Sequence, residues 1–217
     1  MGLRLYDYWR SSAAYRVRIA LALKGVAYDS VPVNIFPGHD EQLLPEYLER
    51  NPQGRVPVLE TDQGLLTQSL AIIVWIDDAY PGPALMPVDP WLRAKARAFG
   101  LAIACDIHPM NNLGVQRQLK AQFGADAEAL AAWGRHWISG GLDALEASLA
   151  KEPVHPFAFG ETPSVADICL VPQLANARRA GLEVETWPRL AAVDRVARAH
   201  PAFFAAAPEN HPHAPKD

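Results

Sequence analysis

Cysteine is scarce in this sequence, and its scarcity argues against a fold held together by disulfides. The 217 residues include two cysteines, Cys105 and Cys169, each in an apolar stretch with helical character. Unpaired thiols in such surroundings are typical core residues of proteins from reducing compartments. We therefore expect no structural disulfide and a cytoplasmic location.

Long hydrophobic runs and a surplus of positive charge are also missing. The longest apolar run, Leu70–Ile76, is too short to cross a bilayer. Asp7 follows the start of the chain too closely for the apolar segment of a signal peptide. The formal net charge is −4, whereas a general nucleic-acid-binding protein carries a basic surplus. We expect neither a membrane nor a nucleic-acid partner, and we assign no metal site.

The first eighty residues do contain alternating strand and helix patterns. Period-two alternation of apolar residues indicates strands, and a turn with Asp and Gly between two of them indicates a hairpin. The expected elements are a strand at Leu3–Tyr8, a helix at Ser12–Lys24 closed by Gly25, a strand through Val31, Val33 and Ile35, a helical stretch at Glu41–Arg50, a hairpin of Val56–Glu60 with Leu65–Leu66, and a helix at Ser69–Ala79. This order predicts an α/β domain.

A proline-rich break follows, and strand patterns almost disappear after it. Residues Tyr80–Pro87 hold three prolines and a glycine, which are incompatible with a regular helix or a central strand. We predict an α/β domain at 1–80, a linker at 81–89 and an all-α domain at 90–217. The expected helices are Trp91 to about Leu119, Asp126–Lys151, Val165–Ala180 and Leu190–Ala199. The tail Pro208–Asp217, with three prolines, is expected to fray.

The start of the first helix carries the sequence Arg10-Ser11-Ser12. A helix N-terminus has unpaired N–H groups and a partial positive charge, so it stabilises an anion such as a thiolate. Position 13 is Ala, so the chain provides no thiol there and any thiolate must come from a cofactor. The simpler interpretation is that one serine only caps the helix. The two roles are compatible.

Two further patterns in the first half suit the binding of a small peptide-like ligand. Pro57 in the strand-like sequence Val56-Pro57 is either an edge residue or part of a special turn that leaves main-chain groups available to an extended peptide. Ser69, in Gln68-Ser69, stands where a helix N-cap belongs, and the amides behind it could bind a carboxylate. A plain capping role is the alternative for Ser69.

The second half offers three patterns that structure alone could explain. Ser164 and Asp167 have the spacing of a capping box, which we interpret as structural. His108–Asn112 breaks a helical stretch with a proline, and this kink faces either a cleft or the surface. Arg178 and Arg179 stand near a helix end, where arginines commonly complement the helix dipole.

The order of these motifs resembles the zeta class of the glutathione transferase superfamily, which includes maleylacetoacetate and maleylpyruvate isomerases. The similarity extends over nearly the whole chain. The segments that carry it are Tyr8–Ser12, Tyr15–Leu21, Asn51–Pro57, Gln68–Ile73, Asp106–Pro109, Asp167–Gln173 and Ala175–Ala177.

The resemblance implies a thioredoxin-like N-terminal domain, a C-terminal helical bundle, a homodimer and glutathione as the cofactor. In this family pattern Ser11 donates to the glutathione sulfur. We add Ser12 and Arg10 to the predicted catalytic set, with Arg10 expected to stabilise enolate charge. Pro57 is cis in this pattern. Arg10 and Arg179 are our own candidates for binding the substrate carboxylates, because guanidinium groups bind carboxylates through two hydrogen bonds. The implied glutathione-binding residues are Gln42, Val56, Pro57, Gln68, Ser69, His108 and Asn112.

The implied activity is cis–trans isomerisation of a small dicarboxylic keto acid, maleylacetoacetate or maleylpyruvate, in the degradation of aromatic compounds. Addition of the cofactor thiolate to the cis double bond permits rotation before the thiolate leaves. Ala13 replaces a cysteine common in this class, which argues against reductive dehalogenation. Two alternatives stay open. One is a general transferase that conjugates electrophiles such as α-haloacids, which an apolar pocket would favour over the isomerase. The other is a non-catalytic interaction module.

Overall fold

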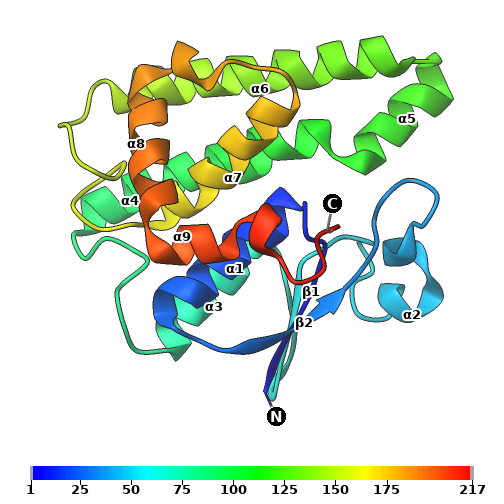
Figure 1. Ribbon diagram of the computed structural model, residues 1–217, viewed down its shortest axis with the longest axis horizontal. Helices are drawn as coiled ribbons and strands as arrows, with labels where there is room; N and C mark the ends of the chain where they lie inside the picture. The colour runs from blue at the N-terminus through cyan, green and yellow to red at the C-terminus, as the bar shows by residue number, and fades with distance from the viewer. Residues whose placement is uncertain (1, 216–217) are drawn as a thin grey trace. The chain divides into compact units, whose positions relative to one another are not determined.

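The structure is a computed structural model that describes residues 2–215 (Figure 1). Contacts within the chain divide it into two compact units. The first contains the residues up to Leu85 together with those from Ala199 onward, and the second is Met86–Arg198. The domain and linker limits predicted from the sequence, 1–80, 81–89 and 90–217, remain a prediction. The contact-based division differs from it mainly at the C-terminal end.

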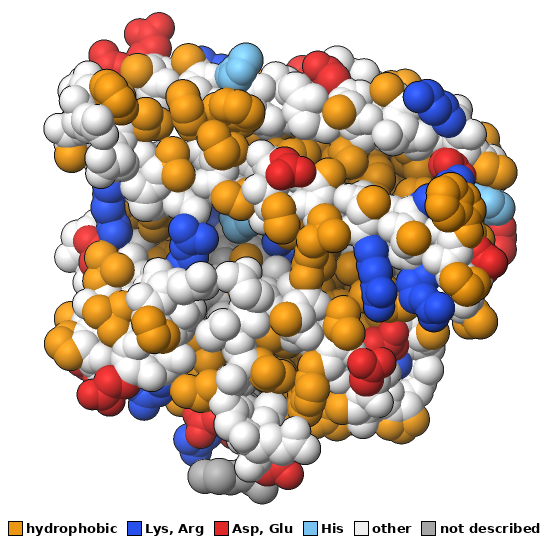
Figure 2. All heavy atoms as spheres, turned by 180° about the vertical axis from the view of Figure 1, so that it is seen from behind, with side chains coloured by type: hydrophobic (Ala, Val, Ile, Leu, Met, Phe, Trp, Pro, Cys, Tyr) orange, Lys and Arg blue, Asp and Glu red, His pale blue; other side chains and the backbone are white. Residues whose placement is uncertain are grey.

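Two features that the composition concerns can be followed in the structure: the distribution of charged side chains on one face and the apolar character of the helices. On the face drawn in Figure 2, Lys and Arg side chains are interspersed with Asp and Glu rather than gathered in one basic area. Within residues 2–215, no helix combines the length and the apolar character that a membrane crossing requires.

A four-stranded mixed sheet forms the centre of the first unit, with the strand order β2-β1-β3-β4. β1 is parallel to β2, and β3 is antiparallel to both β1 and β4. The strands are β1 Leu3–Asp7, β2 Tyr28–Pro32, β3 Val58–Thr61 and β4 Gly64–Thr67. The second strand was predicted too far along the chain. Val33 makes one more hydrogen bond to Asp7, at 2.7 Å, and the chain then leaves the sheet.

Helices cover both faces of this sheet (Figure 1). α1 (Ser12–Lys24) and α3 (Ser69–Ala79) lie on one face, over the fully buried Leu5 and Leu59. On the other face Tyr6 and Val58 pack against Tyr47 of the short helix α2. The elements here are η1 Glu41–Leu43 and α2 Pro45–Leu48, where one longer helical stretch was expected.

α1 ends as predicted. Gly25 follows it with a φ of 65°, a left-handed conformation that glycine adopts without steric cost, and its N–H group bonds to carbonyl groups of the last turn.

The prediction of a frayed C-terminal tail is wrong for the residues that the structure describes. α9 (Pro201–Ala206) contacts α1, and η5 (Pro208–Asn210) follows it. His211 is 6% exposed and lies 3.1 Å from Asp7 of β1. This long-range polar contact holds the segment against the first unit, which local proline content does not predict. Residues 216 and 217 lie outside the described range.

The second unit is helical throughout its regular elements. Its longest helix was expected to run from Trp91 to about Leu119, but Pro109 lacks an N–H group and a π-helical turn precedes it. The elements are α4 Pro90–Leu101, η2 Ala102–Ile107, η3 His108–Asn111, α5 Leu113–Phe123, α6 Ala127–Leu149, α7 Val165–Arg179, η4 Val184–Thr186 and α8 Pro188–Ala199.

The predicted capping box at the start of α7 is present. The Ser164 side chain accepts a hydrogen bond from the first turn, and the Asp167 side chain accepts one from the Ser164 N–H group at 2.8 Å. Burial of Asp167 raises the pKa of its carboxyl group to about 6, despite hydrogen bonds from Ala158 and Ser164 that act in the opposite direction.

The π-helical turn fits the unit because α6 contains a glycine opposite it. A Cβ atom on Gly141 would lie 2.3 Å from Cγ1 and 2.4 Å from Cδ1 of Ile107, which is 3% exposed. Gly140, one residue earlier on α6, is exposed and has nothing within 4 Å of an added Cβ.

We therefore expect Gly141→Ala to destabilise the protein and Gly140→Ala to stabilise it slightly. Overpacking a filled site typically costs ~1–3 kcal/mol. Alanine instead of glycine in an open helical position gains up to ~1 kcal/mol. Chemical denaturation of both variants measures the two free energies of unfolding. Equal effects of the two substitutions would show that the contact with Ile107 does not restrict position 141.

Candidate functional site

The register of the sheet brings three of the predicted site segments to the same end. Tyr6 of β1 lies opposite Val58 of β3, and Val58 lies opposite Thr67 of β4. β1 ends one residue after Tyr6, β3 begins at Val58 and β4 ends at Thr67. The loop after β1, the residues before β3 and the start of α3 therefore meet at one end of the sheet.

Ser11 is the N-cap of α1, as the simpler interpretation predicted. Its Oγ accepts a hydrogen bond from the Ala14 N–H group at 3.2 Å, and its own N–H group donates to the Tyr8 carbonyl oxygen at 2.8 Å. A hydroxyl group that accepts still has one hydrogen to donate. Ser11 is partly exposed, whereas Ser12 is 6% exposed. Of the two serines, Ser11 is thus better placed to reach a ligand.

Arg10 is exposed in the same loop. Its guanidinium carbon lies 5.8 Å from the centre of the Trp9 ring, within the range of a cation–π contact.

Side-chain hydrogen bonds hold the main chain of the loop before β3. The Val56–Pro57 bond is cis. The Arg55 carbonyl oxygen accepts hydrogen bonds from Asn51 Nδ2 at 2.7 Å and from the Tyr47 hydroxyl at 2.8 Å. These bonds fix the main chain immediately before Val56.

Gln42 lies against the same loop. A Cβ atom on Gly54, whose φ is 58°, would lie 3.1 Å from the Gln42 carbonyl oxygen, so the two segments are in close contact. The Gln42 side chain is 4% exposed, and its Oε1 has no hydrogen-bond partner among residues 2–215. A buried acceptor of this kind is suited to receive a donor from a ligand.

The N-cap of α3 lies one residue earlier than expected, although the helix begins at Ser69 as predicted. Gln68 is the N-cap, with a φ of 67°, and Ser69 is the first helical residue. Gln68 Nε2 donates to Gln53 Oε1 at 2.8 Å. Ser69 is buried, and its Oγ accepts a hydrogen bond at 3.2 Å from Nη1 of Arg16, which is 1% exposed. Arg16 therefore links α1 to α3 near their N-termini.

This end of the sheet is suited to anions. Two helices of 13 and 11 residues begin there, and each directs unpaired N–H groups and partial positive charge toward its N-terminus. The arrangement can hold a carboxylate at one helix and a thiolate at the other, with the Ser11 hydroxyl as a donor.

The remaining predicted residues belong to the second unit. His108 begins η3, and Asn112 is the N-cap of α5, where its Oδ1 accepts from the Val115 N–H group at 3.1 Å. Arg179 is the exposed last residue of α7. Its neighbour Arg178 forms an ion pair with Asp194 at 2.5 Å.

Sequence reasoning assigned no role to the buried arginines of α1. Arg16 and Arg18 interrupt the run Ala14–Leu21, and both are at most 3% exposed. Two arginines in a helix segment without acidic residues require partners elsewhere in the fold. That pattern could have predicted their contacts with Ser69 and Asp7.

Family comparisons agree with this geometry. Residues 5–84 match the glutathione S-transferase N-terminal domain, and residues 114–198 match the glutathione S-transferase C-terminal domain. The chain belongs to the zeta class of the glutathione transferase family. The predicted resemblance and the predicted fold class, a thioredoxin-like domain followed by a helical domain, are confirmed.

Relatives of this zeta-class chain match it over almost its full length. Maleylacetoacetate isomerase of Pseudomonas aeruginosa is 46% identical over 98% of this chain and 99% of its own length. The holo structure of a maleylpyruvate isomerase, a bacterial zeta-class enzyme, is 43% identical, with a TM-score of 0.94 over 98% of this chain and 100% of that one. A maleylacetoacetate isomerase from Methylobacterium extorquens, with bound malonate and glutathione, is 36% identical, with the same TM-score and coverage.

Proposed function

We propose that this protein is a glutathione-dependent cis–trans isomerase of a small dicarboxylic keto acid, maleylacetoacetate or maleylpyruvate. The observation that carries the proposal is the convergence of two helix N-termini and the Ser11 hydroxyl at one end of the sheet. It occurs in a chain with 46% identity to a maleylacetoacetate isomerase. An interaction module without catalytic activity would have no need for this arrangement.

The residues at this end of the sheet fit glutathione by the chemistry of their donors. Ser69 and the first N–H groups of α3 suit the γ-glutamyl carboxylate, together with the Gln68 amide. The main-chain groups of Val56 suit pairing with an extended peptide. The buried Oε1 of Gln42 suits an N–H donor. His108 and Asn112 remain predicted contacts.

When bound, glutathione supplies a thiol that adds reversibly to the activated double bond. Ser11 keeps this thiol in its reactive thiolate form, because a hydroxyl donor and a helix N-terminus both favour the charged species. The protein provides no thiol of its own at position 13, which is Ala.

Arg10 and Arg179 are the proposed anchors for the two carboxylates of the substrate. A guanidinium group binds a carboxylate through two parallel hydrogen bonds and stabilises negative charge that develops on an adjacent enolate. A polar, arginine-containing site favours isomerisation of a diacid over general conjugation of apolar electrophiles.

A homodimer and a cytoplasmic location belong to the same proposal. Sedimentation of the purified protein tests the dimer, which should give about twice the mass of one chain.

Glutathione dependence is the first test. We expect isomerase activity to disappear without glutathione and S-methylglutathione not to restore it, because a thioether forms no thiolate. The absorbance of each cis keto acid, followed with dialysed protein, measures this. Full turnover without added thiol would contradict the mechanism. Conjugation of α-haloacids without isomerisation would favour the general transferase.

Ser11→Ala should raise the pKa of the bound glutathione thiol and lower kcat, with a smaller change in glutathione affinity. Loss of a hydrogen bond to a charged group costs ~1.5–3 kcal/mol, or roughly tenfold or more in rate. Loss of the cap should also reduce the free energy of unfolding by ~1 kcal/mol. Ser12→Ala is the matched control, and a larger kinetic effect there would exchange the roles of the two serines.

Arg179→Ala should raise the KM for the diacid roughly ten- to a hundredfold, because a bidentate contact with a carboxylate is lost in ground state and transition state alike. If Arg179 only complements the helix dipole, the substitution should instead cost up to ~1 kcal/mol of stability and leave the kinetics unchanged.

Arg178→Ala is the control for this measurement, since adjacent residues of a helix point about 100° apart. Burial raises the pKa of Asp194 and the ion pair with Arg178 opposes this, so removing Arg178 leaves a buried carboxyl group with less support. Arg178→Ala should therefore reduce stability without raising KM. Equal kinetic effects of the two substitutions, or none from either, would leave Arg10 as the only candidate anchor.

A further inference from the structure

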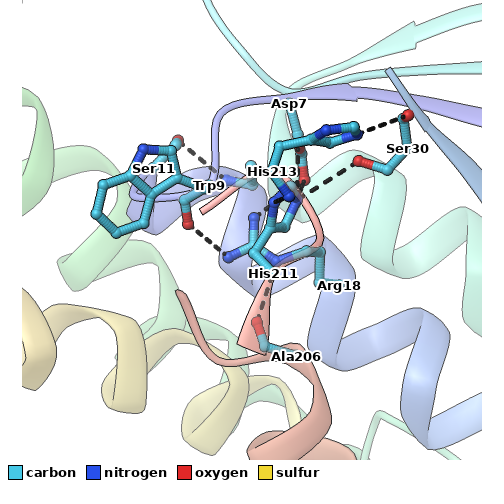
Figure 3. Close-up of polar contacts among 9 residues, drawn as sticks. Asp7, Trp9, Ser11, Arg18, Ser30, Ala206, His211 and His213 are labelled. Atoms are coloured by element: carbon cyan, nitrogen blue, oxygen red, sulfur yellow. Dashed lines mark hydrogen bonds and ion pairs between the residues drawn. The ribbon is translucent and has the colours of Figure 1, made fainter. Parts of the chain in front are cut away.

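A buried ion pair lies at the end of β1, next to the loop that carries Ser11 (Figure 3). Asp7, the last residue of β1, is fully buried, and Arg18 of α1 is 3% exposed. Arg18 Nη1 donates to Asp7 Oδ2 at 3.0 Å. Removing one partner of such a pair leaves an uncompensated buried charge, so each partner restrains the position of the other.

Arg18 uses its other two nitrogens to join two distant parts of the chain. Nη2 donates to the Trp9 carbonyl oxygen at 3.0 Å, two residues before Ser11. Nε donates to the Ala206 carbonyl oxygen at 3.0 Å, at the end of α9. One guanidinium group therefore restrains both the Ser11 loop and the C-terminal segment.

The C-terminal segment contacts the same ion pair through His211. Its Nε2 lies 3.1 Å from Oδ1 and 3.2 Å from Oδ2 of Asp7. Its Nδ1 faces the backbone N–H group of His213 at 3.2 Å. Because a backbone N–H can only donate, Nδ1 is the acceptor and Nε2 carries the ring proton. His211 is thus a hydrogen-bond donor to Asp7.

We propose that Arg18 and His211 are positioning residues for the reacting site, and that Ala207–His211 is a C-terminal strap that fixes the Ser11 loop. The inference rests on the proposed function of Ser11 as the donor to the glutathione thiolate. The connection runs from His211 to Asp7, from Asp7 to Arg18, and from Arg18 to the Trp9 carbonyl group.

The loop needs such support because its donor must be preorganised. A hydroxyl group stabilises a thiolate only at hydrogen-bond distance, and a displacement of about 1 Å can cost up to a hundredfold in rate. The N–H bond from Ser11 to Tyr8 fixes the turn itself, and Arg18 fixes the turn to the rest of the unit.

Two amide substitutions of His211 separate positioning from simple stabilisation. The His211→Asn amide occupies the place of Nδ1, so it still accepts from the His213 N–H group but leaves Asp7 without this donor. The longer His211→Gln amide places an N–H group near the position of Nε2 and retains the donor to Asp7. His213→Ala is the control, because His213 is exposed and its side chain contacts Ser30 and the His211 ring rather than Asp7.

We expect His211→Asn to raise the pKa of the bound glutathione thiol and to lower kcat by about tenfold, with KM changed much less. His211→Gln should restore both values toward those of the unchanged protein, and His213→Ala should leave both unchanged. The thiol pKa is measured by thiolate absorbance in the complex with glutathione alone, at a temperature where circular dichroism shows each variant folded.

A lower melting temperature in His211→Asn, with an unchanged thiol pKa and unchanged kcat, would overturn the proposal and leave the strap a stabilising element only. Equal kinetic loss in the Asn and Gln variants would also overturn it. Because the thiol pKa is measured without substrate, it stays informative even if the unchanged protein binds glutathione and isomerises neither keto acid. That result would refute the proposed function and not the positioning role.

Discussion

The candidate site depends on the register of three strands. Tyr6, Val58 and Thr67 lie side by side across β1, β3 and β4. A slip of one residue in either pairing would turn alternate side chains to the opposite face of the sheet and move the start of α3 along the strand direction. The fully buried Leu59 and Val58, on opposite faces of β3, make such a slip costly. Packing of the sheet thus sets the position of main-chain groups that the chemistry uses.

Buried charge is the second constraint, and α1 carries two buried arginines. Arg16 and Arg18 lie in the core of the first unit, where an unpaired guanidinium would be strongly destabilising. Arg16 bonds to Ser69 at the start of α3, and Arg18 bonds to Asp7 at the end of β1. The ion pair that compensates the desolvation of Arg18 is therefore also a contact that orients the end of β1, and the Arg16 hydrogen bond joins α1 to the start of α3. The same polar contacts thus contribute to the stability of the first unit and to the position of the site segments.

Local patterns predicted the elements whose formation is decided locally. α1 begins and ends where the sequence indicated, because its N-cap Ser11, its apolar run and the closing Gly25 lie close together in the chain. α3 also covers its predicted range, although its N-cap is Gln68 instead of Ser69. The strap was mispredicted because its stability comes from a contact between residues 204 positions apart. The π-helical turn was missed for a similar reason, since it requires the missing side chain of Gly141 on another helix. Periodicity contains no information about either contact.

The site itself was harder to infer from single motifs than from their order, and the geometry explains why. Much of the proposed binding uses main-chain N–H groups at helix starts, which many sequences can provide. Ser11 illustrates this ambiguity: its Oγ accepts the capping bond from Ala14, and the same acceptance leaves its hydrogen available for a thiolate. A serine that caps a helix and a serine that donates to a thiolate are therefore found in the same sequence pattern. The two roles differ only in what surrounds the serine, and here a loop held through Arg18 and Asp7 surrounds it.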